Sequence, residues 1–160
     1  EKAKWFNQQY LRMHSDAELA EKFKPVLKEK GIAKDDAFIV EFCKLVKEKV
    51  QFVHEFWDQG KYVFEEPAAY DEKVMTKKWN DKSKTIFTAV MDHFKGVDDW
   101  NSANVTAAFH ATEATQGKID MQLLRVLTTG VAGGPQLFDM LSLIGKEGTI
   151  QRLEKALSKF

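Results

Sequence analysis

The stretch LLRVLTTGVAGGPQLFDMLSLIGKEGTIQRLEKAL, residues Leu123 to Leu157, carries most of the information about the fold. Apolar residues recur at helical spacing in three segments of this stretch. The segments are separated by Thr129–Gly130, by Gly133–Pro135 and by Gly145. Proline is tolerated at the first position of a helix and glycine often follows the last, so these residues mark helix ends. The stretch therefore predicts three short helices that form a compact C-terminal unit.

Apolar patterns with the same period precede this unit along the chain. The capping box that begins at Ser15 and the pair Asp35–Asp36 mark the starts of two helices, and Pro25 predicts a kink or a restart in the first of them. A further apolar pattern ends at Gly60. No segment alternates convincingly between apolar and polar residues as a strand would. The sequence therefore predicts an all-α fold, an irregular multi-helix domain made of two small helical subdomains.

Two turns are candidates for the junction between the subdomains, the loop from Glu65 to Ala69 and the turn from Gly96 to Asn101. We place the boundary at the second turn. This gives an N-terminal helical subdomain over residues 1–96 and a C-terminal helical subdomain over residues 97–160.

Composition limits the class of protein. The chain has 160 residues, of which 44% are hydrophobic and 30% charged, and it begins at Glu1 and not at methionine. It has no visible signal peptide and no apolar run of about 18 residues. The single cysteine, Cys43, excludes an internal disulfide, and its apolar surroundings in the sequence predict a buried thiol. We expect a piece of a longer cytoplasmic protein that does not enter a membrane.

The formal net charge is zero, from 24 basic and 24 acidic residues. General nucleic-acid binders rely on many Lys and Arg that release counterions from phosphates. This balance, together with the lack of a basic recognition helix, argues against a DNA-binding helix-turn-helix protein. The acidic residues are concentrated between residues 51 and 100, so the two ends of the chain together can form a weakly basic face.

No catalytic or metal-binding pattern stands out. The four histidines are scattered and form no pair at ligand spacing. The acidic pairs lie at predicted helix starts, where capping explains them. The glycines at 130, 133 and 134 follow no strand and precede no Lys-Ser/Thr, so they do not form a phosphate-binding loop. We predict no catalytic and no metal-binding residues.

Several motifs occur in an order that resembles a known family. Arg125 in an apolar helix, Thr129–Gly130, Gly134–Pro135 and Arg152–Leu153 are similar to the C-terminus of bacterial-type glutamyl-tRNA synthetases. The opening segment Lys4–Arg12 is similar to the Trp-x-Asn-x-x-Tyr-Ile segment that follows the catalytic part in that family. The resemblance spans nearly the whole chain. The motifs are individually loose, but their order and spacing together are specific.

The resemblance implies that the chain is the anticodon-binding part of such an enzyme and that it recognises the anticodon loop of glutamate tRNA as a monomer. The family's catalytic part uses ATP and Mg to ligate glutamate to its tRNA, and it carries His-x-Gly-His-type and Lys-Met-Ser-Lys-type motifs that are not present here. The segment Lys73–Lys78 is superficially similar to the second motif but lies in a helical pattern. We therefore expect no aminoacylation by this chain alone and no cofactor bound to it.

Five residues match positions to which the resemblance gives a role in RNA binding. Arg125 matches an arginine that contacts an anticodon base, since a guanidinium can both stack on a base and bond to its edge. The alternative is a surface arginine paired with an acid. Gly134, Pro135 and Leu137 match a loop-to-helix segment that packs against an anticodon base, and the alternative is a helix start over a core leucine. Lys49 lies where many members have an arginine that reads the last anticodon base. Lysine lacks the bidentate geometry of arginine, so the choice between glutamate and glutamine tRNA stays open.

A second function is compatible with the sequence, namely a helical protein-interaction module without RNA binding. Its aromatic residues, 12% of the chain, and its short C-terminal helices would form a groove for a partner helix. RNA binding predicts that Lys49, Arg125 and Gly134–Leu137 share one exposed face. An exposed apolar groove favours the protein-interaction alternative.

Overall fold

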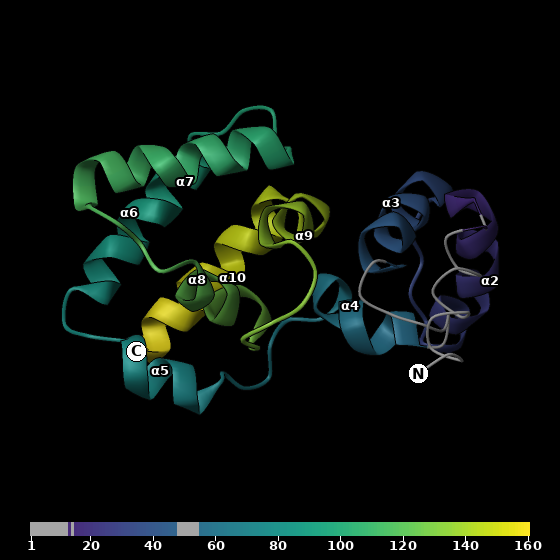
Figure 1. Ribbon diagram of the computed structural model, residues 1–160, viewed down its shortest axis with the longest axis horizontal. Helices are drawn as coiled ribbons and strands as arrows, with labels where there is room; N and C mark the ends of the chain where they lie inside the picture. Colours follow the sequence, from purple (N-terminus) through teal and green to yellow (C-terminus); the bar gives the residue numbers. More distant parts are fainter. Residues whose placement is uncertain (1–12, 14, 48–54) are drawn as a thin grey trace. The chain divides into compact units, whose positions relative to one another are not determined.

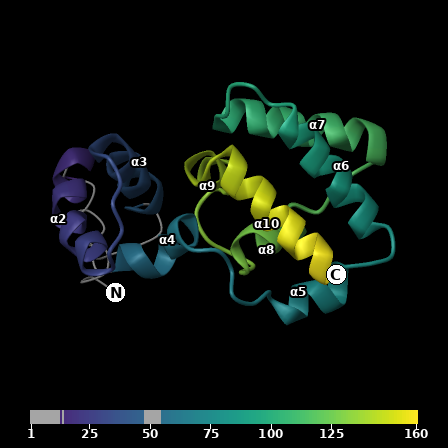
Figure 2. The same cartoon turned by 180° about the vertical axis from the view of Figure 1, so that it is seen from behind.

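The computed structural model of the chain describes residues 13, 15–47 and 55–160. These residues form nine α-helices and contain no strand, which confirms the predicted all-α fold. The helices, shown in Figure 1 and from behind in Figure 2, are α2 (Asp16–Glu29), α3 (Asp36–Val46), α4 (Phe56–Phe64), α5 (Glu72–Lys78), α6 (Ser83–Lys95), α7 (Ser102–Gln116), α8 (Met121–Thr129), α9 (Leu137–Ile144) and α10 (Lys146–Lys159). Lys49 and the segment Lys4–Arg12 lie outside the described residues.

The chain divides into two compact units. The first unit comprises Glu1–Phe64 with Gly134–Gln136, and the second comprises Glu65–Gly133 with Leu137–Phe160. The division falls at Glu65, in the first of the two candidate junctions, and not after residue 96. The reason is that α6 packs against α7 and α10, so the residues between 65 and 96 belong with the C-terminal helices.

Aromatic packing forms the core of the first unit. Phe23 of α2 stacks on Phe42 of α3 with 5.2 Å between ring centroids, and Phe64 of α4 meets Phe42 edge-on at 4.8 Å. Gly60 does not end α4, contrary to the prediction. A Cβ at Gly60 would collide with the Phe42 ring, so this glycine permits the close approach of α4 to α3.

The helix starts of the first unit confirm the predicted caps. The Ser15 hydroxyl accepts a hydrogen bond from the Glu18 N–H at 3.1 Å, and the Asp35 carboxylate accepts one from the Phe38 N–H at 2.8 Å. The restart predicted at Pro25 does not occur, because α2 continues through it. Cys43 is fully buried, as predicted, and burial raises the pKa of its thiol to about 12, so it stays protonated and unreactive at neutral pH.

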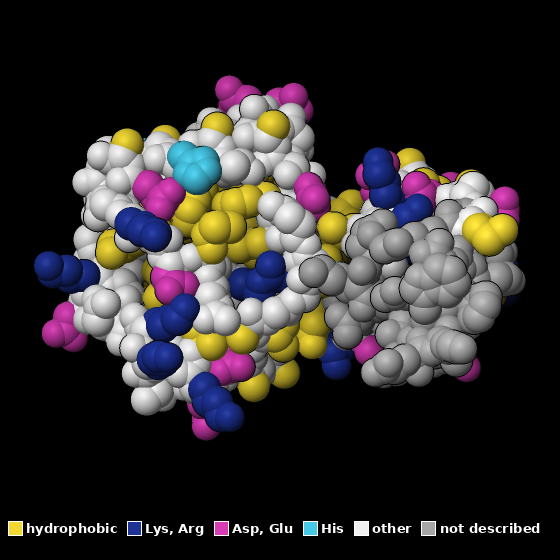
Figure 3. Space-filling view, viewed as in Figure 1, with side chains coloured by type: hydrophobic (Ala, Val, Ile, Leu, Met, Phe, Trp, Pro, Cys, Tyr) yellow, Lys and Arg dark blue, Asp and Glu magenta, His cyan; other side chains and the backbone are white. Residues whose placement is uncertain are grey.

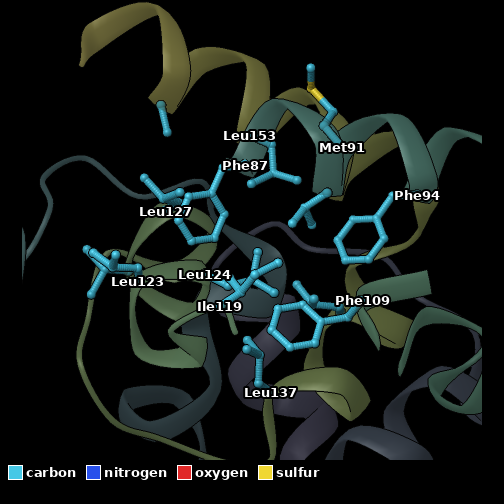
Figure 4. Packing of buried hydrophobic residues seen from close by; sticks show 14 of the residues in the cluster. Phe87, Met91, Phe94, Phe109, Ile119, Leu123, Leu124, Leu127, Leu137 and Leu153 are labelled. Carbon is cyan, nitrogen blue, oxygen red and sulfur yellow. The ribbon is translucent and has the colours of Figure 1, made fainter. Parts of the chain in front are cut away.

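The second unit has one continuous hydrophobic core to which α5 to α10 contribute. Figure 4 shows side chains of several of these helices converging in it. The largest fully buried members are Phe87, Phe94, Phe109, Leu124, Leu127 and Leu137. Hydrogen bonds also connect distant segments of this unit. The Trp100 indole donates to the Leu141 carbonyl at 2.9 Å, and Lys146 Nζ donates to the Val97 carbonyl at 2.7 Å.

The last three helices confirm the prediction of a C-terminal unit of three short helices. α8 ends before Gly130 at φ +83°, and α9 ends before Gly145 at φ +91°. The start predicted for the middle helix at Gly133–Pro135 is wrong by about one half-turn, since α9 begins at Leu137. None of the described helices combines the length and the apolar composition that crossing a membrane requires.

Candidate functional site

Helix α8 carries the arginine that the sequence singled out, and its ends are fixed by local bonds. The Asp120 carboxylate caps the start by accepting hydrogen bonds from Gln122 N–H at 2.8 Å and Leu123 N–H at 3.3 Å. Gly130 closes the other end in the left-handed conformation. Between these caps most side chains of α8 are buried, and Arg125 is only partly buried. The helix therefore holds Arg125 on a rigid support at the surface of the second unit.

The surroundings of Arg125 define its position. Its Nη1 lies 3.8 Å from the sulfur of Met140, a fully buried residue of α9. Its carbonyl accepts hydrogen bonds from the hydroxyls of Thr129 at 2.7 Å and Thr128 at 3.2 Å. Burial lowers the pKa of the Arg125 guanidinium, but an arginine stays charged in proteins at any neutral pH. The site thus offers a permanent, partly desolvated positive charge on a planar group.

The turn after α8 is held by the rest of the second unit. A Cβ on Gly130 would collide with the Ala69 carbonyl oxygen and lie 2.9 Å from Pro67 Cβ, so only glycine fits there. The Gln122 amide reaches across the turn and donates to the Ala132 carbonyl at 3.3 Å. The path of the chain from α8 toward Gly133 is therefore determined by contacts on both sides.

A second arginine, which is buried, supports the turn at the end of α8. Arg152 of α10 is 4% exposed, and its Nη1 donates to the Thr128 carbonyl at 3.2 Å. Burial lowers the pKa of Arg152, and the neighbouring carboxylate of Glu66 acts in the opposite direction. The last carbonyls of a helix lack partners within the helix, so Arg152 stabilises the C-terminal end of α8.

The predicted site residues are distributed as follows. Arg125 and Leu137 belong to the second unit, and Gly134 and Pro135 belong to the first. Gly134 has φ +143°, a conformation that favours glycine. Leu137 is 2% exposed and packs in the core, as the alternative interpretation expected of its side chain. Its role as a base contact, the role of Lys49 and the shared exposed face stay predictions.

An open groove lies next to α8, at a position that the sequence did not predict. It has a volume of about 460 Å³ and is lined by residues that include Phe109 and His110 of α7 and Met121 and Gln122 of α8. Figure 3 shows hydrophobic side chains gathered on this face in the area framed by α7, α8 and α9. Met121 and Gln122 precede Arg125 by about one helical turn, so they lie on the same side of α8 as Arg125. Residues of α7, of α8 and of the turn between them line it.

Carboxylates at this groove are engaged by the protein itself. The two oxygens of Glu113 lie 3.0 Å from the Ile119 N–H and 2.8 Å from His110 Nδ1, and the Ile119 N–H is the main reason that the pKa of Glu113 is lowered. Burial raises the pKa of Asp120, but Lys78 at 2.9 Å and two backbone N–H groups outweigh burial, so that pKa is lowered as well. In the described part of the chain, no three His, Cys, Asp or Glu side chains lie close enough together to hold a metal ion.

Comparisons of the sequence and of the structure with known proteins lead to the same group of proteins. Residues 18–157 match the family described as anticodon binding domain. Glutamate–tRNA ligases of Flavobacterium psychrophilum and Flavobacterium johnsoniae are 39% and 37% identical to the chain over 162 residues, which are 99% of this chain and 32% of each ligase. The crystal structure of a glutamate tRNA ligase from Elizabethkingia meningosepticum matches with a TM-score of 0.89 and 31% identity, over 97% of this chain and 31% of that one. The chain therefore spans about a third of the length of these relatives.

Proposed function

The chain belongs to the anticodon-binding domain family, and from that premise we propose that it recognises the anticodon of a glutamate tRNA as one part of a longer glutamate–tRNA ligase. The observation that carries this proposal is the family match over residues 18–157, within which Arg125 lies on a rigid helix at the surface. A synthetase of this kind must distinguish its tRNA from others, and the anticodon is a set of unstacked bases that protein side chains can reach.

Arg125 is the residue that we expect to contact an anticodon base directly. Its guanidinium can stack on a base and donate two parallel hydrogen bonds to the base edge. The partial burial of Arg125 strengthens such bonds, since less water competes for the donors. The hydroxyls of Thr128 and Thr129 bond to the Arg125 carbonyl, so the backbone of Arg125 is ordered before tRNA binds.

The segment before α9 is expected to supply the second contact. Gly134 and Pro135 would pack against a neighbouring base, and the N–H groups at the start of α9 are suited to a phosphate. Leu137 anchors this helix start in the core of the second unit. We propose Lys49 as a contact for the last anticodon base, where its ammonium gives charge without the bidentate geometry of arginine.

The ligation chemistry belongs, in this proposal, to the other two thirds of such a ligase. That part would bind ATP and Mg, and this chain would contribute tRNA recognition in the cytoplasm as a monomer without a cofactor of its own.

The open groove beside α7 and α8 is the one observation that favours the alternative, a module that binds a partner helix. The same titration separates the two functions. A protein-interaction module is expected not to bind tRNA in this titration. Anticodon recognition requires that the chain bind tRNA with an affinity that depends on the anticodon.

The test is a fluorescence titration of the 160-residue chain with glutamate tRNA and with the same tRNA carrying an altered anticodon. Arg125→Ala should reduce the preference for the natural anticodon by about tenfold to a hundredfold, the range of one lost bidentate base contact. Arg125→Lys should recover affinity but not the preference, because it keeps the charge and loses the planar fork. If Arg125→Ala weakened both tRNAs equally, Arg125 would be a general phosphate contact and the assignment of the base contact would fail.

A further inference from the structure

Helix α5 is the part of the second unit that the proposed function leaves without a role. Its segment Lys73–Lys78 is the one that superficially resembles an ATP-site loop, and in the structure it is a helix that packs on α8. Val74 and Met75 are buried, whereas Lys73, Thr76 and Lys77 are exposed. Residues separated by three or four positions share one side of a helix, so these three exposed residues form a single polar face.

Lys78 connects this helix to the start of α8. Its Nζ lies 2.9 Å from Asp120, the residue that caps α8. Lys118 lies two residues before Asp120 in the turn between α7 and α8, and it is exposed and lines the groove. The ion pair therefore brings the end of α5 next to the turn that carries Lys118. Figure 3 shows Lys and Arg side chains over α5 and beside this turn on the same face.

Several carboxylates of this surface form hydrogen bonds or ion pairs within the protein, whereas three of its lysines form no ion pair with any described residue. Asp120 is engaged by Lys78 and by two N–H groups of α8, and Glu113 by His110 and the Ile119 N–H. Asp71 caps α5 by accepting from the Val74 N–H at 3.0 Å, and Glu72 lies at the positive start of the same helix. Among the residues that the structure describes, no carboxylate lies within ion-pair distance of Lys73, Lys77 or Lys118. These three exposed lysines, which we call the lysine surface, form no ion pair within the described part of the chain, although Lys118 lies near enough to Glu113 to contribute to its lowered pKa.

The lysine surface adjoins the start of the helix that carries the candidate base contact. Asp120, the cap residue that pairs with Lys78, precedes Arg125 by five residues, which corresponds to about 7.5 Å along the helix axis. Exposed lysines are flexible, hydrated point charges that bind phosphate oxygens without reading a base. A surface of this kind next to a base contact fits the backbone of the nucleic acid whose bases are read beside it.

We propose that Lys73, Lys77 and Lys118 bind phosphates of the anticodon stem of the tRNA and supply affinity that does not depend on the anticodon sequence. This inference rests on the proposed function, since it takes tRNA as the ligand. It divides the binding of tRNA between two sets of residues. Arg125 and the turn before α9 select the anticodon, and the lysine surface holds the adjoining stem whatever the anticodon is.

The experiment is a salt titration of tRNA binding by the full 160-residue chain. The variants are Lys73→Ala/Lys77→Ala and Lys118→Ala, with Lys28→Ala/Lys44→Ala as the control that removes two exposed lysines from α2 and α3 of the first unit. Alanine favours helix at exposed helical positions, so the α5 variant should fold, and thermal unfolding of each variant checks this. Glutamate tRNA with its natural and with an altered anticodon serves as the probe.

The expected size follows from counterion release. Each phosphate contact to a duplex contributes about −0.9 to the slope of log affinity against log salt, which is about 3.5-fold between 50 and 200 mM salt. Over that range the Lys73→Ala/Lys77→Ala variant should therefore lose about tenfold less affinity than the wild-type chain, and Lys118→Ala about 3.5-fold less. The preference for the natural anticodon should be unchanged in all of them, and the control should keep the wild-type slope.

The outcomes separate this inference from the proposed function. An unchanged slope in the α5 variant, or an equal change in the control, would overturn the lysine surface and leave anticodon recognition intact. A wild-type chain that ignores the anticodon, but whose salt slope depends on these lysines, would overturn anticodon recognition and keep the lysine surface as a general RNA contact. If the wild-type chain bound neither tRNA at 50 mM salt, both proposals would fail.

Discussion

Replacing Gly130 by alanine tests how the second unit holds the turn after α8. Gly130 has φ +83°, which costs an L-residue about 1–2 kcal/mol. The added Cβ would also collide with the Ala69 carbonyl oxygen and lie 2.9 Å from Pro67. Because a backbone oxygen cannot rotate away as a side chain can, the loop must shift, which adds about 1–3 kcal/mol as in other overpacked sites. We expect Gly130→Ala to lower the free energy of unfolding by about 2–5 kcal/mol.

Two other glycines separate the two contributions. Gly117 has φ +86° with ψ −179°, a region essentially restricted to glycine, but no atom within 4 Å of its hypothetical Cβ, so Gly117→Ala should show a conformational cost alone, about 1–3 kcal/mol. Gly133 has neither a positive φ nor a neighbour within 4 Å. Gly133→Ala should therefore leave stability unchanged or raise it by up to about 1 kcal/mol, because alanine restricts the unfolded chain.

The assay is urea unfolding of the full chain, followed by tryptophan fluorescence. With Trp5 and Trp57 replaced by phenylalanine, Trp79 and Trp100 report on the second unit. The reasoning about the close contact fails if Gly130→Ala costs no more than about 2 kcal/mol, the upper limit for its backbone conformation alone. The reasoning about backbone conformation fails if Gly117→Ala behaves like Gly133→Ala.

Two further substitutions test the ends of α8. Arg152→Met should lower the free energy of unfolding by about 1–3 kcal/mol in the same assay, because the buried Thr128 carbonyl loses a charged donor, and a variant as stable as the wild type would show that this bond adds nothing. Asp120→Ala should cost about 1 kcal/mol at neutral pH, whereas Asp120→Asn should keep the cap and lose only the ion pair with Lys78. The folded-state pKa of Asp120 is lowered, so its stabilisation is present above the ordinary carboxyl range and lost as the pH falls through the folded pKa. Wild type and Asp120→Ala should thus converge in acid, and a gap that persisted there would contradict the assignment.

Local interactions explain which parts of the fold the sequence could predict. Ser15 and Asp35 cap their helices within three residues, and Gly145 ends α9 through its own backbone conformation. Such signals need no knowledge of the rest of the chain. Gly60 shows the opposite case, since it looks like a helix end, and only the Phe42 ring on another helix reveals that it permits close packing. The division at Glu65 also depends on how α6 packs against α10, elements far apart in the sequence.

The candidate site also combines features that are visible in the local sequence with features that depend on distant helices. Arg125 could be singled out because a single arginine interrupts an apolar helix within a recognisable order of motifs, and its contact with a base stays a prediction. Its neighbour Met140 lies fifteen residues away on α9, and the partner of Thr128, Arg152, lies on α10. The burial of Leu137 could not be separated from a role at the surface by spacing alone, since a helix start over a core and a helix start at a ligand have the same sequence pattern.

The net charge of the chain does not show which charged side chains are engaged within the protein and which are exposed. A net charge of zero argues against a general nucleic-acid binder only if acids and bases are equally available to a ligand. On the second unit some carboxylates are engaged by the protein itself, because Asp71 and Asp120 cap helices and Glu113 closes the turn after α7, while Lys73 and Lys77 lie exposed on α5. Capping uses carboxylates at helix starts, where the helix dipole favours them, and leaves lysines to the outer faces. A chain that is neutral as a whole can therefore still carry exposed lysines that form no ion pair with the residues that the structure describes, and the phosphate contacts that we propose need only a few of them.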